Sequence, residues 1–232
     1  MTTAVTHPDM PKARILIVDD HPIFRQGIGQ LIDGQEDMLC CGEAEDLKST
    51  LRTIPEKKPD LILVDMRLAN EDGLDLIKAV KVDHPDMPML AISQFDETVY
   101  AERVLRAGGS GYLMKEEAAE EVLSAIRTVL KGELYVTRKM AVLVLHKLLE
   151  QPNNSQHGDV ASLSDRELQV FSLLGGGLST RKIAIKLGVS FKTIESHREN
   201  IKRKLGIADA ASLLRHAADW ARSQPNGAPA PR

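Results

Sequence analysis

Five polar side chains follow short apolar runs in the first half of the sequence, and their types suit one chemistry. Asp19 and Asp20 come directly after the first run, and Asp65 comes after the third. Ser93 follows the fourth run and Lys115 the fifth. Clustered carboxylates repel one another unless a cation neutralises them, and oxygen ligands without His or Cys favour Mg²⁺. A metal and a lysine beside a carboxylate suit phosphoryl transfer, with Asp65 attacking the phosphorus in line.

Each of these residues, taken singly, also has a simpler structural interpretation. An aspartate at a strand end often caps the next helix, and Asp20, two residues before Pro22, fits such a cap. A lone serine carries little information, and Lys115 beside Glu116 could be a solvated surface charge. We favour the functional interpretation because five independent run ends provide groups of compatible chemistry.

The apolar runs that position these side chains are rich in Ile, Val and Leu. Near-continuous apolarity over such short lengths is typical of strands buried on both faces of a parallel sheet. Helical patterns separate the runs, so strand and helix alternate along the chain. The alternation predicts an α/β fold with a doubly wound five-stranded parallel sheet, which binds ligands beyond the carboxyl ends of its strands. The runs are Arg14–Val18, Met38–Cys41, Leu61–Val64, Pro88–Ile92 and Gly111–Met114.

The second half of the chain predicts helices only. An apolar-periodic pattern over Leu134–Leu149 predicts a helix, and the polar stretch Gln151–Asp159 predicts a loop. A capping-box pattern at Ser164 opens the next helix, and a last helix is expected from about Asp209 to Ala221. We therefore expect a sheet domain, a linker helix and loop, an all-α four-helix domain and a disordered tail, at residues 12–132, 133–162, 163–222 and 223–232.

The net charge of −3 hides a difference between the two parts of the chain. Residues 1–158 have a net charge of −8, and residues 159–232 a net charge of +5. The basic part is a candidate for contact with a polyanion, although chance could produce the same asymmetry. No apolar run reaches the length of a membrane span, and no secretory signal is visible. We therefore expect no association with a membrane. The adjacent Cys40 and Cys41 cannot form a disulfide framework, which suits a reducing cytoplasm, so we expect a cytoplasmic protein.

Three motifs of the first half resemble the receiver domain of bacterial response regulators. The resemblance covers roughly residues 12–132. Many receivers have Pro after the lysine, where this chain has Glu116; the difference bears on the local backbone and not on the chemistry. The motifs are Ile15–His21, Leu61–Leu68 with Asp72-Gly73, and Gly111–Lys115.

The receiver resemblance implies a role for each polar residue. Asp65 is expected to accept a phosphoryl group from a sensor histidine kinase. Mg²⁺ (or Mn²⁺) is expected at Asp19, Asp20, Asp65 and the backbone carbonyl of Arg67. The phosphoryl group is expected to contact Ser93 and Lys115, Tyr112 to act as the switch aromatic, and His21 to be a structural neighbour of the site.

The sequence from Leu178 to Gly206 predicts two helices joined by a turn at Gly188. Ser179 and Ser190 are their candidate N-caps. Two helices across a short turn, with the second one basic and exposed, are typical of a recognition helix in the DNA major groove. A solvated amphipathic helix is the alternative, because acidic residues dilute the charge. The cations expected opposite its apolar face are Lys192, Arg198, Lys202 and Arg203.

The basic part resembles the LuxR-type helix-turn-helix over about residues 160–221, and the whole chain resembles NarL/FixJ-type response regulators. The resemblance rests on Leu163–Leu168, Leu178-Ser179, Ile183-Ala184, Thr193-Ile194, His197 and Lys204–Ile207. The family often has Lys after the Thr-Ile pair; this chain has Glu195, which could accept a hydrogen bond from cytosine N4. The residues expected to contact double-stranded promoter DNA are Lys182, Lys192, Thr193, Glu195, Ser196, His197, Arg198, Lys202 and Arg203.

Together the resemblances imply a transcription regulator that phosphorylation switches. It would not be an enzyme, apart from Mg²⁺-dependent phosphoryl transfer to Asp65 and autodephosphorylation. The new charge would draw Ser93 inward and Tyr112 after it, changing the surface around residues 96–131. The change would uncover a recognition helix that the unphosphorylated receiver covers. The protein would then bind DNA as a homodimer through the helix at 209–221, with RNA polymerase as a further candidate partner.

Two other functions stay open on the sequence. A metal-dependent phosphohydrolase could use an aspartyl nucleophile, but its familiar form has a second Asp two positions later, where this chain has Arg67. A phosphorylation-controlled adaptor whose helix-turn-helix no longer binds DNA is the other alternative. Glu195 and Glu199 on the expected recognition helix favour the adaptor.

Overall fold

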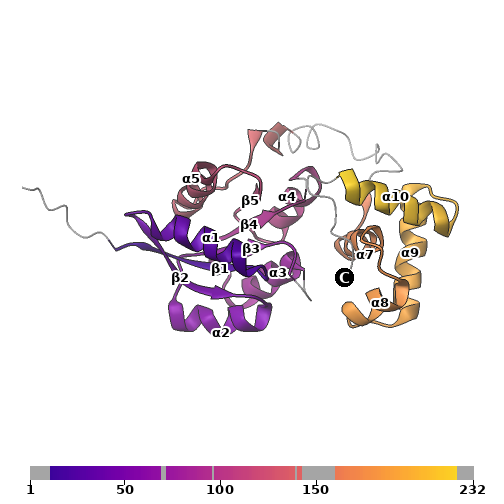
Figure 1. Cartoon of the computed structure of the whole chain (residues 1–232), viewed down its shortest axis with the longest axis horizontal. Helices are drawn as coiled ribbons and strands as arrows, with labels where there is room; N and C mark the ends of the chain where they lie inside the picture. The colour runs from indigo at the N-terminus through magenta and orange to yellow at the C-terminus, as the bar shows by residue number, and fades with distance from the viewer. Residues whose placement is uncertain (1–10, 69–71, 96, 139, 143–159, 224–232) are drawn as a thin grey trace, which may run out of the picture.

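A computed structural model describes residues 11–68, 72–95, 97–138, 140–142 and 160–223, and contains a sheet domain followed by a helical domain (Figure 1). The sheet has five parallel strands in the order β2-β1-β3-β4-β5. Every residue of the inner strands β3 and β4 is buried, as the continuous apolar runs predict. The predicted doubly wound sheet is confirmed. The strands are β1 (Ala13–Val18), β2 (Met38–Ala44), β3 (Leu61–Asp65), β4 (Met89–Ser93) and β5 (Gly111–Met114).

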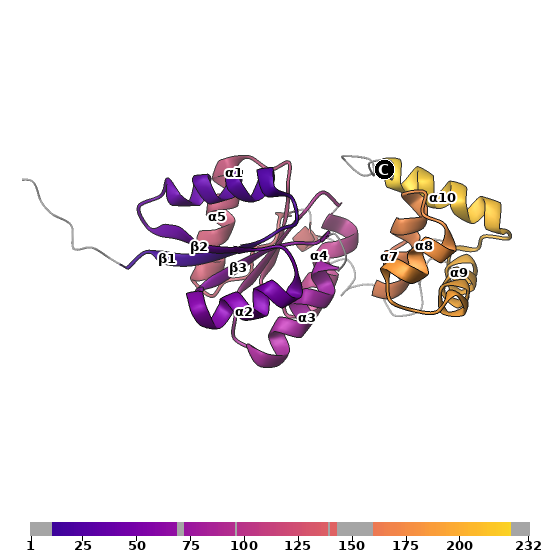
Figure 2. The same ribbon diagram turned by 60° about the horizontal axis from the view of Figure 1, so that its bottom comes forward.

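Helices cover both faces of the sheet (Figure 2). Successive β1 residues point to opposite faces, because side chains alternate along a strand. Ile15 and Ile17 pack in the core under α1 and α5, and Leu16 and Val18 pack in the core under α2, α3 and α4. The helices are α1 (Pro22–Asp33), α2 (Leu47–Lys57), α3 (Gly73–Asp83), α4 (Glu97–Arg106) and α5 (Ala119–Leu130).

Two tight connections form the carboxyl edge of the sheet. Helix α1 begins at Pro22 with His21 as the N-cap residue, and no side chain caps it, so the interpretation of Asp20 as a cap is wrong. Asp20 stands one position before the N-cap residue, so its carboxylate is left for other contacts. After β3, Gly73 packs so closely that a Cβ atom would overlap the backbone of Asp65 and Met66.

The segment after α5 differs from the prediction of a helix over Leu134–Leu149. Tyr135 pairs with Gly111 of β5 in an isolated parallel bridge, and its N–H donates to the Ser110 carbonyl at 2.9 Å. This pairing with the sheet holds residues 134–136 outside any helix, and helical structure begins at residue 138. Residues 143–159, which include the predicted loop, and the predicted tail beyond residue 223 lie outside the described residues.

The helical domain begins with the short 3₁₀ helix η1 (Val160–Ser162) and has the predicted four helices. Ser164, Ser179 and Ser190 each accept a hydrogen bond from a backbone N–H of the helix that they cap. Gly188 has a φ of 63°, in the left-handed region that the turn before the third helix requires. The helices are α7 (Asp165–Gly175), α8 (Thr180–Lys186), α9 (Phe191–Leu205) and α10 (Ala210–Ser223).

The two domains meet through polar and aromatic contacts. Arg103 of α4 donates to Asp165 at 2.8 Å and to the carbonyls of Ala161 and Leu163 at 3.1 and 2.6 Å. Lys78 of α3 lies 2.6 Å from the other oxygen of Asp165. The pairing ties the start of α7 to α3 and α4.

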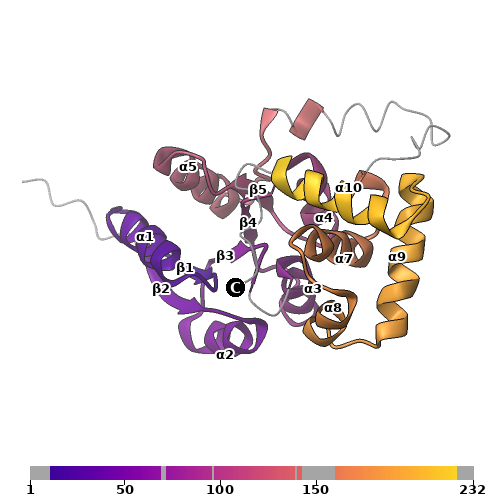
Figure 3. The ribbon, with the colours of Figure 1, turned by 45° about the vertical axis from the view of Figure 1, so that its right-hand side comes forward.

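The long helix α9 lies on the side of the helical domain that faces away from the sheet domain (Figures 1 and 3). The expectation that the receiver covers this helix is therefore wrong for this structure. The helices nearer the sheet domain are α7, α8 and α10 (Figure 3), and Asp165 of α7 and Trp220 of α10 contact that domain.

Within the residues that the structure describes, no helix is long and apolar enough to cross a membrane.

Candidate functional site

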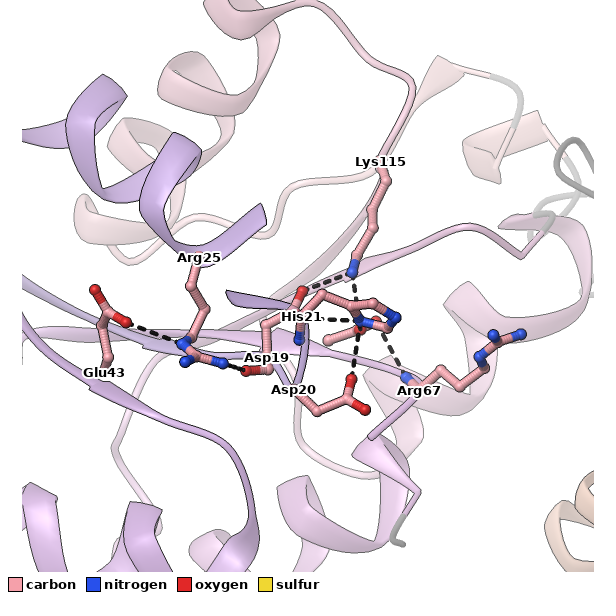
Figure 4. Close-up of polar contacts among 8 residues, drawn as sticks. Asp19, Asp20, His21, Arg25, Glu43, Arg67 and Lys115 are labelled. Atoms are coloured by element: carbon pink, nitrogen blue, oxygen red, sulfur yellow. Dashed lines mark hydrogen bonds and ion pairs between the residues drawn. The ribbon is translucent and has the colours of Figure 1, made fainter. Parts of the chain in front are cut away.

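The carboxyl edge of the sheet brings three aspartates and a lysine together. Asp19 and Asp65 are 1% and 2% exposed, and the side chain of Lys115, from the turn after β5, is 8% exposed. The Lys115 Nζ lies 2.6 Å from Asp19 Oδ2 and 2.8 Å from Asp65 Oδ2, and thus bridges the ends of β1 and β3 (Figure 4). Asp20 lies beside them with a side chain that is 20% exposed. The structure thus brings together the four charged groups that the sequence predicts at this edge.

Burial sets the electrostatics of Asp65. Burial raises the pKa of the Asp65 carboxyl, while the Lys115 ammonium acts in the opposite direction. The backbone N–H of Arg67 donates to Asp65 Oδ1 at 3.1 Å, and the Arg67 side chain points away from the cluster (Figure 4). Asp65 therefore has one oxygen held by the backbone and one held by an ammonium group.

Two further residues stand beside the cluster: His21, which the sequence predicts as a structural neighbour of the site, and Arg25, which it does not single out. The His21 Nδ1 lies 3.1 Å from Asp19 Oδ1 and 2.9 Å from Asp20 Oδ1. The Arg25 guanidinium donates to the Asp19 carbonyl at 2.5 Å and pairs with Glu43 at 2.9 Å, which ties the start of α1 to β2 (Figure 4). The contacts of His21 agree with its predicted place beside the site, whereas the Arg25 contact depends on the packing of α1, which no local pattern reveals.

The residues of this cluster fit a divalent cation. Oxygens of Asp19, Asp20 and Asp65 and the His21 ring lie within 4.8 Å of one another. Asp20 Oδ1 is buried and accepts no hydrogen bond from any described residue, although His21 Nδ1 lies 2.9 Å away. A buried carboxylate oxygen without a donor is a natural ligand for a hard cation.

The predicted switch residues are buried and meet at Phe95. Ser93 Oγ accepts a hydrogen bond from the Phe95 N–H at 3.1 Å, and the Tyr112 hydroxyl donates to the Phe95 carbonyl at 2.6 Å. The Phe95 ring stacks on Tyr100 at 4.8 Å between centroids and faces Trp220 of α10 at 6.3 Å. Phe95, which no sequence motif singled out, therefore connects the end of β4 to the helical domain.

The residues predicted to contact DNA lie along α8 and α9, but they differ in exposure. Lys182, Lys192, Ser196 and Arg203 are exposed. Thr193 Oγ1 lies 2.8 Å from the capping hydroxyl of Ser190. Glu195 and His197 are partly exposed.

Arg198 differs from the exposed cation that the sequence predicts. Its side chain is only 16% exposed, because it donates to Thr180 Oγ1 of α8 at 2.6 Å and to Glu195 at 2.9 Å. Lys202 is 18% exposed and pairs with Glu199 at 2.9 Å. Two of the four cations predicted on α9, Arg198 and Lys202, are therefore largely covered and paired with carboxylates of the same helix.

Comparison with protein families identifies both domains. Residues 15–127 match the response regulator receiver domain, and residues 161–217 match the bacterial regulatory proteins of the luxR family. The chain therefore belongs to the two-component response regulators that carry a LuxR-type DNA-binding domain. Receiver domains generally bind Mg²⁺ at an acidic pocket, and the aspartate cluster stands at the corresponding edge of this sheet.

Relatives cover nearly the whole chain. It is 34% identical over 212 residues to the oxygen regulatory protein NreC of Staphylococcus aureus strain bovine RF122 / ET3-1, covering 88% of this chain and 96% of that protein. A solved structure of RcsB from Salmonella typhimurium is similar at a TM-score of 0.71 and 25% identity, covering 91% of this chain and 99% of that one. A second structure is RcsB from Salmonella enterica serovar Typhimurium bound to promoter rprA in the presence of the phosphomimetic BeF₃⁻. Its TM-score is 0.68 at 25% identity, and the match covers 90% of this chain and 99% of that one.

Proposed function

We propose that a sensor histidine kinase phosphorylates Asp65 and that the phosphoryl group controls the binding of this protein to promoter DNA in the cytoplasm. The observation that carries the proposal is the Lys115 ammonium that bridges Asp19 and Asp65, beside a buried Asp20 oxygen that accepts no hydrogen bond from the described residues. In the transfer, a phosphohistidine P–N bond breaks as an Asp65 carboxylate oxygen bonds to phosphorus. Mg²⁺ (or Mn²⁺), held by Asp19, Asp20, Asp65 and the Arg67 carbonyl, would neutralise charge on the transferring group.

The residues of the chain supply the rest of the transfer chemistry. The Lys115 ammonium lies 2.8 Å from an Asp65 oxygen, so it stands where the phosphoryl oxygens develop charge. Its ring contact with Phe24, at 4.1 Å from the centroid, limits its alternative positions. Autodephosphorylation by water at the same carboxyl is part of the proposal.

Phosphorylation of Asp65 can be tested directly. The protein is treated with acetyl phosphate and Mg²⁺, and intact mass is expected to show one added phosphoryl group that is stable to acid and labile to alkali. Asp65→Asn should lose the adduct, because the amide cannot form an acyl phosphate. An adduct that persists in Asp65→Asn would overturn the assignment. Steady hydrolysis of a phosphate ester would instead favour the phosphohydrolase alternative.

The contacts of Phe95 support a route from the site to the helical domain. A phosphoryl group on Asp65 would draw Ser93 Oγ away from the Phe95 N–H, and Tyr112 would follow into the vacated space and release the Phe95 carbonyl. The Phe95 ring would then lose its position against Trp220. The surface that changes would lie around residues 96–131.

The position of the domains supports control through α10 rather than through coverage of α9. The ring centroid of Trp220 lies 5.6 Å from that of Phe171 and 6.3 Å from that of Phe95. Helix α10, which we propose as the homodimer interface, therefore packs toward the receiver. Release of Phe95 would make α10 available to a second copy, and the dimer would place two copies of α9 on DNA. RNA polymerase is a further proposed partner. We keep residues 12–132, 133–162, 163–222 and 223–232 as the proposed receiver, linker, DNA-binding domain and tail.

DNA binding separates this proposal from the adaptor alternative. The RcsB relatives were solved on promoter DNA, which supports a similar ligand for this chain. Fragments of the protein's own promoter region, titrated in an anisotropy assay with phosphorylated protein, are expected to bind. Failure of every duplex to bind at low salt would favour the adaptor.

A further inference from the structure

The recognition helix α9 pairs two of its cations with its own carboxylates. Arg198 Nη1 lies 2.9 Å from Glu195 Oε1, and Lys202 Nζ lies 2.9 Å from Glu199 Oε1. In both pairs the cation stands three residues after the carboxylate, where side chains of a helix are neighbours. The same restraint therefore occurs twice, one turn apart, on the helix that is proposed to read DNA.

In both pairs the carboxylate is the outer partner. The Glu195 and Glu199 side chains are 40% and 67% exposed, whereas those of Arg198 and Lys202 are 16% and 18% exposed. A phosphate group that approaches this part of α9 therefore meets negative charge before it meets positive charge. The neighbouring Arg203 is exposed, and its guanidinium donates to the neutral amide oxygen of Asn200 at 2.9 Å.

Arg198 is held in a place that leaves one of its donors unused. Its Nη1 donates to Thr180 Oγ1 of α8 at 2.6 Å as well as to Glu195. Its Nε is buried and has no hydrogen-bond partner among the residues that the structure describes. An unsatisfied buried donor is unfavourable, so the Arg198 guanidinium would gain hydrogen bonding by leaving this position for a phosphate group.

We propose that Glu195 and Glu199 hold Arg198 and Lys202 off the phosphates of DNA, and that Glu195 thereby acts as a specificity-determining residue. The inference rests on the proposed DNA binding through α9. Phosphate contacts supply affinity without sequence information, so the restraint weakens binding to any duplex that offers Glu195 no hydrogen-bond donor. A site that offers a donor to Glu195, such as cytosine N4, draws the carboxylate to the base and frees Arg198 for the backbone.

The test measures binding of the full chain to a fluorescein-labelled duplex of mixed sequence over a range of salt concentrations. Glu195→Gln and Glu199→Gln keep the side-chain shape and remove the charge that restrains the cation. Each variant should bind this duplex more tightly than the unchanged protein. Each should also steepen the dependence of log K on log salt concentration by about 0.9, the slope expected for one added phosphate contact.

Asp219→Asn is the matched control. Asp219 pairs with Arg222 at the same three-residue spacing, and both side chains are well exposed, but the pair lies on α10. The substitution changes the net charge of the protein by the same amount as each glutamate substitution. It should leave the salt slope unchanged.

The outcomes separate the inference from the function on which it rests. Unchanged salt slopes in both glutamine variants, or an equal steepening in Asp219→Asn, would overturn the inference while leaving DNA binding intact. Absence of binding by the unchanged protein and by all variants at low salt would overturn the proposed DNA binding itself.

Discussion

Asp72 is the N-cap residue of α3 and has a cost in stability that a single substitution can remove. Its carboxylate caps the helix by accepting the Leu74 N–H at 2.9 Å. Burial raises the pKa of Asp72 to about 6, although the Leu74 hydrogen bond acts in the opposite direction. The carboxyl is therefore partly protonated in the folded protein at a pH where it would be charged in the unfolded chain.

The sign of the resulting pH dependence follows from the raised pKa. The contribution of Asp72 to stability is fully present below the unfolded pKa of 3.8 and is lost as the pH rises through about 6. Asp72→Asn keeps a capping oxygen without the charge, so it should raise the free energy of unfolding at about pH 8. The gain should stay well below the limit of about 3 kcal/mol set by the shift, because the residue is partly solvent-exposed.

Thermal unfolding at several pH values checks the Asp72 prediction. The gain should disappear as the pH falls toward 3.8, and Asp75→Asn, an exposed carboxylate of the same helix, should show no comparable gain. Equal gains from both variants would attribute the effect to net charge and not to burial of Asp72.

Some residues of the site have a role that the local sequence reveals, and others do not. Asp65 and Lys115 stand at the ends of apolar runs, so the parallel direction of the predicted strands places them at one edge of the sheet. Phe95 stands in a loop, and its role depends on a stacking contact with Trp220, which lies 125 positions later in the chain. No pattern of period two or 3.6 carries that information.

At the scale of elements, the start of α7 shows how local sequence fixes a boundary. Ser164 Oγ accepts the Glu167 N–H at 3.4 Å, and Glu167 Oε2 accepts the Ser164 N–H at 2.8 Å. Glu167 also pairs with Lys204 of α9 at 2.6 Å. The cap therefore supports both the helix start and the packing of α9 against α7.

Loss of the cap should destabilise the helical domain. Ser164→Ala is expected to lower the free energy of unfolding by about 1 kcal/mol, because it removes the acceptor of a helix N-terminal N–H. Urea unfolding followed by the fluorescence of Trp220, the single tryptophan of the chain, reports on this domain. Ser172→Ala, within the same helix, is the control. A similar loss in both variants would contradict the capping role.

The elements also show where the sequence misleads. The strands and caps were predictable because buried strands and capping residues have local signatures. The apolar pattern over Leu134–Leu149 is that of a helix. The Tyr135 backbone instead forms a bridge with Gly111 and donates its N–H to Ser110, so it is not available for helical hydrogen bonds. Tertiary pairing with the sheet outweighs helix periodicity here, and only the assembled fold reveals the partner.

At the scale of the whole molecule, an ion-pair network and an aromatic contact hold the domains together. Burial raises the pKa of Asp165, but hydrogen bonds from Lys78 and Arg103 outweigh burial and leave the pKa below its usual value. The polar contacts fix the start of α7 against the receiver, and the Phe95–Trp220 contact fixes α10. Of these, only Phe95 is directly bonded to both predicted switch residues, Ser93 and Tyr112.

In the proposed mechanism, Asp65 signals to the helical domain through Phe95. The most direct test is the change in Trp220 fluorescence when the protein is phosphorylated. With acetyl phosphate and Mg²⁺, the unchanged protein should show a shift of tryptophan emission to longer wavelength, in proportion to the phosphorylated fraction measured by mass. Asp65→Asn should show no shift. An unaltered emission in fully phosphorylated protein, or the same shift in Asp65→Asn, would contradict the account.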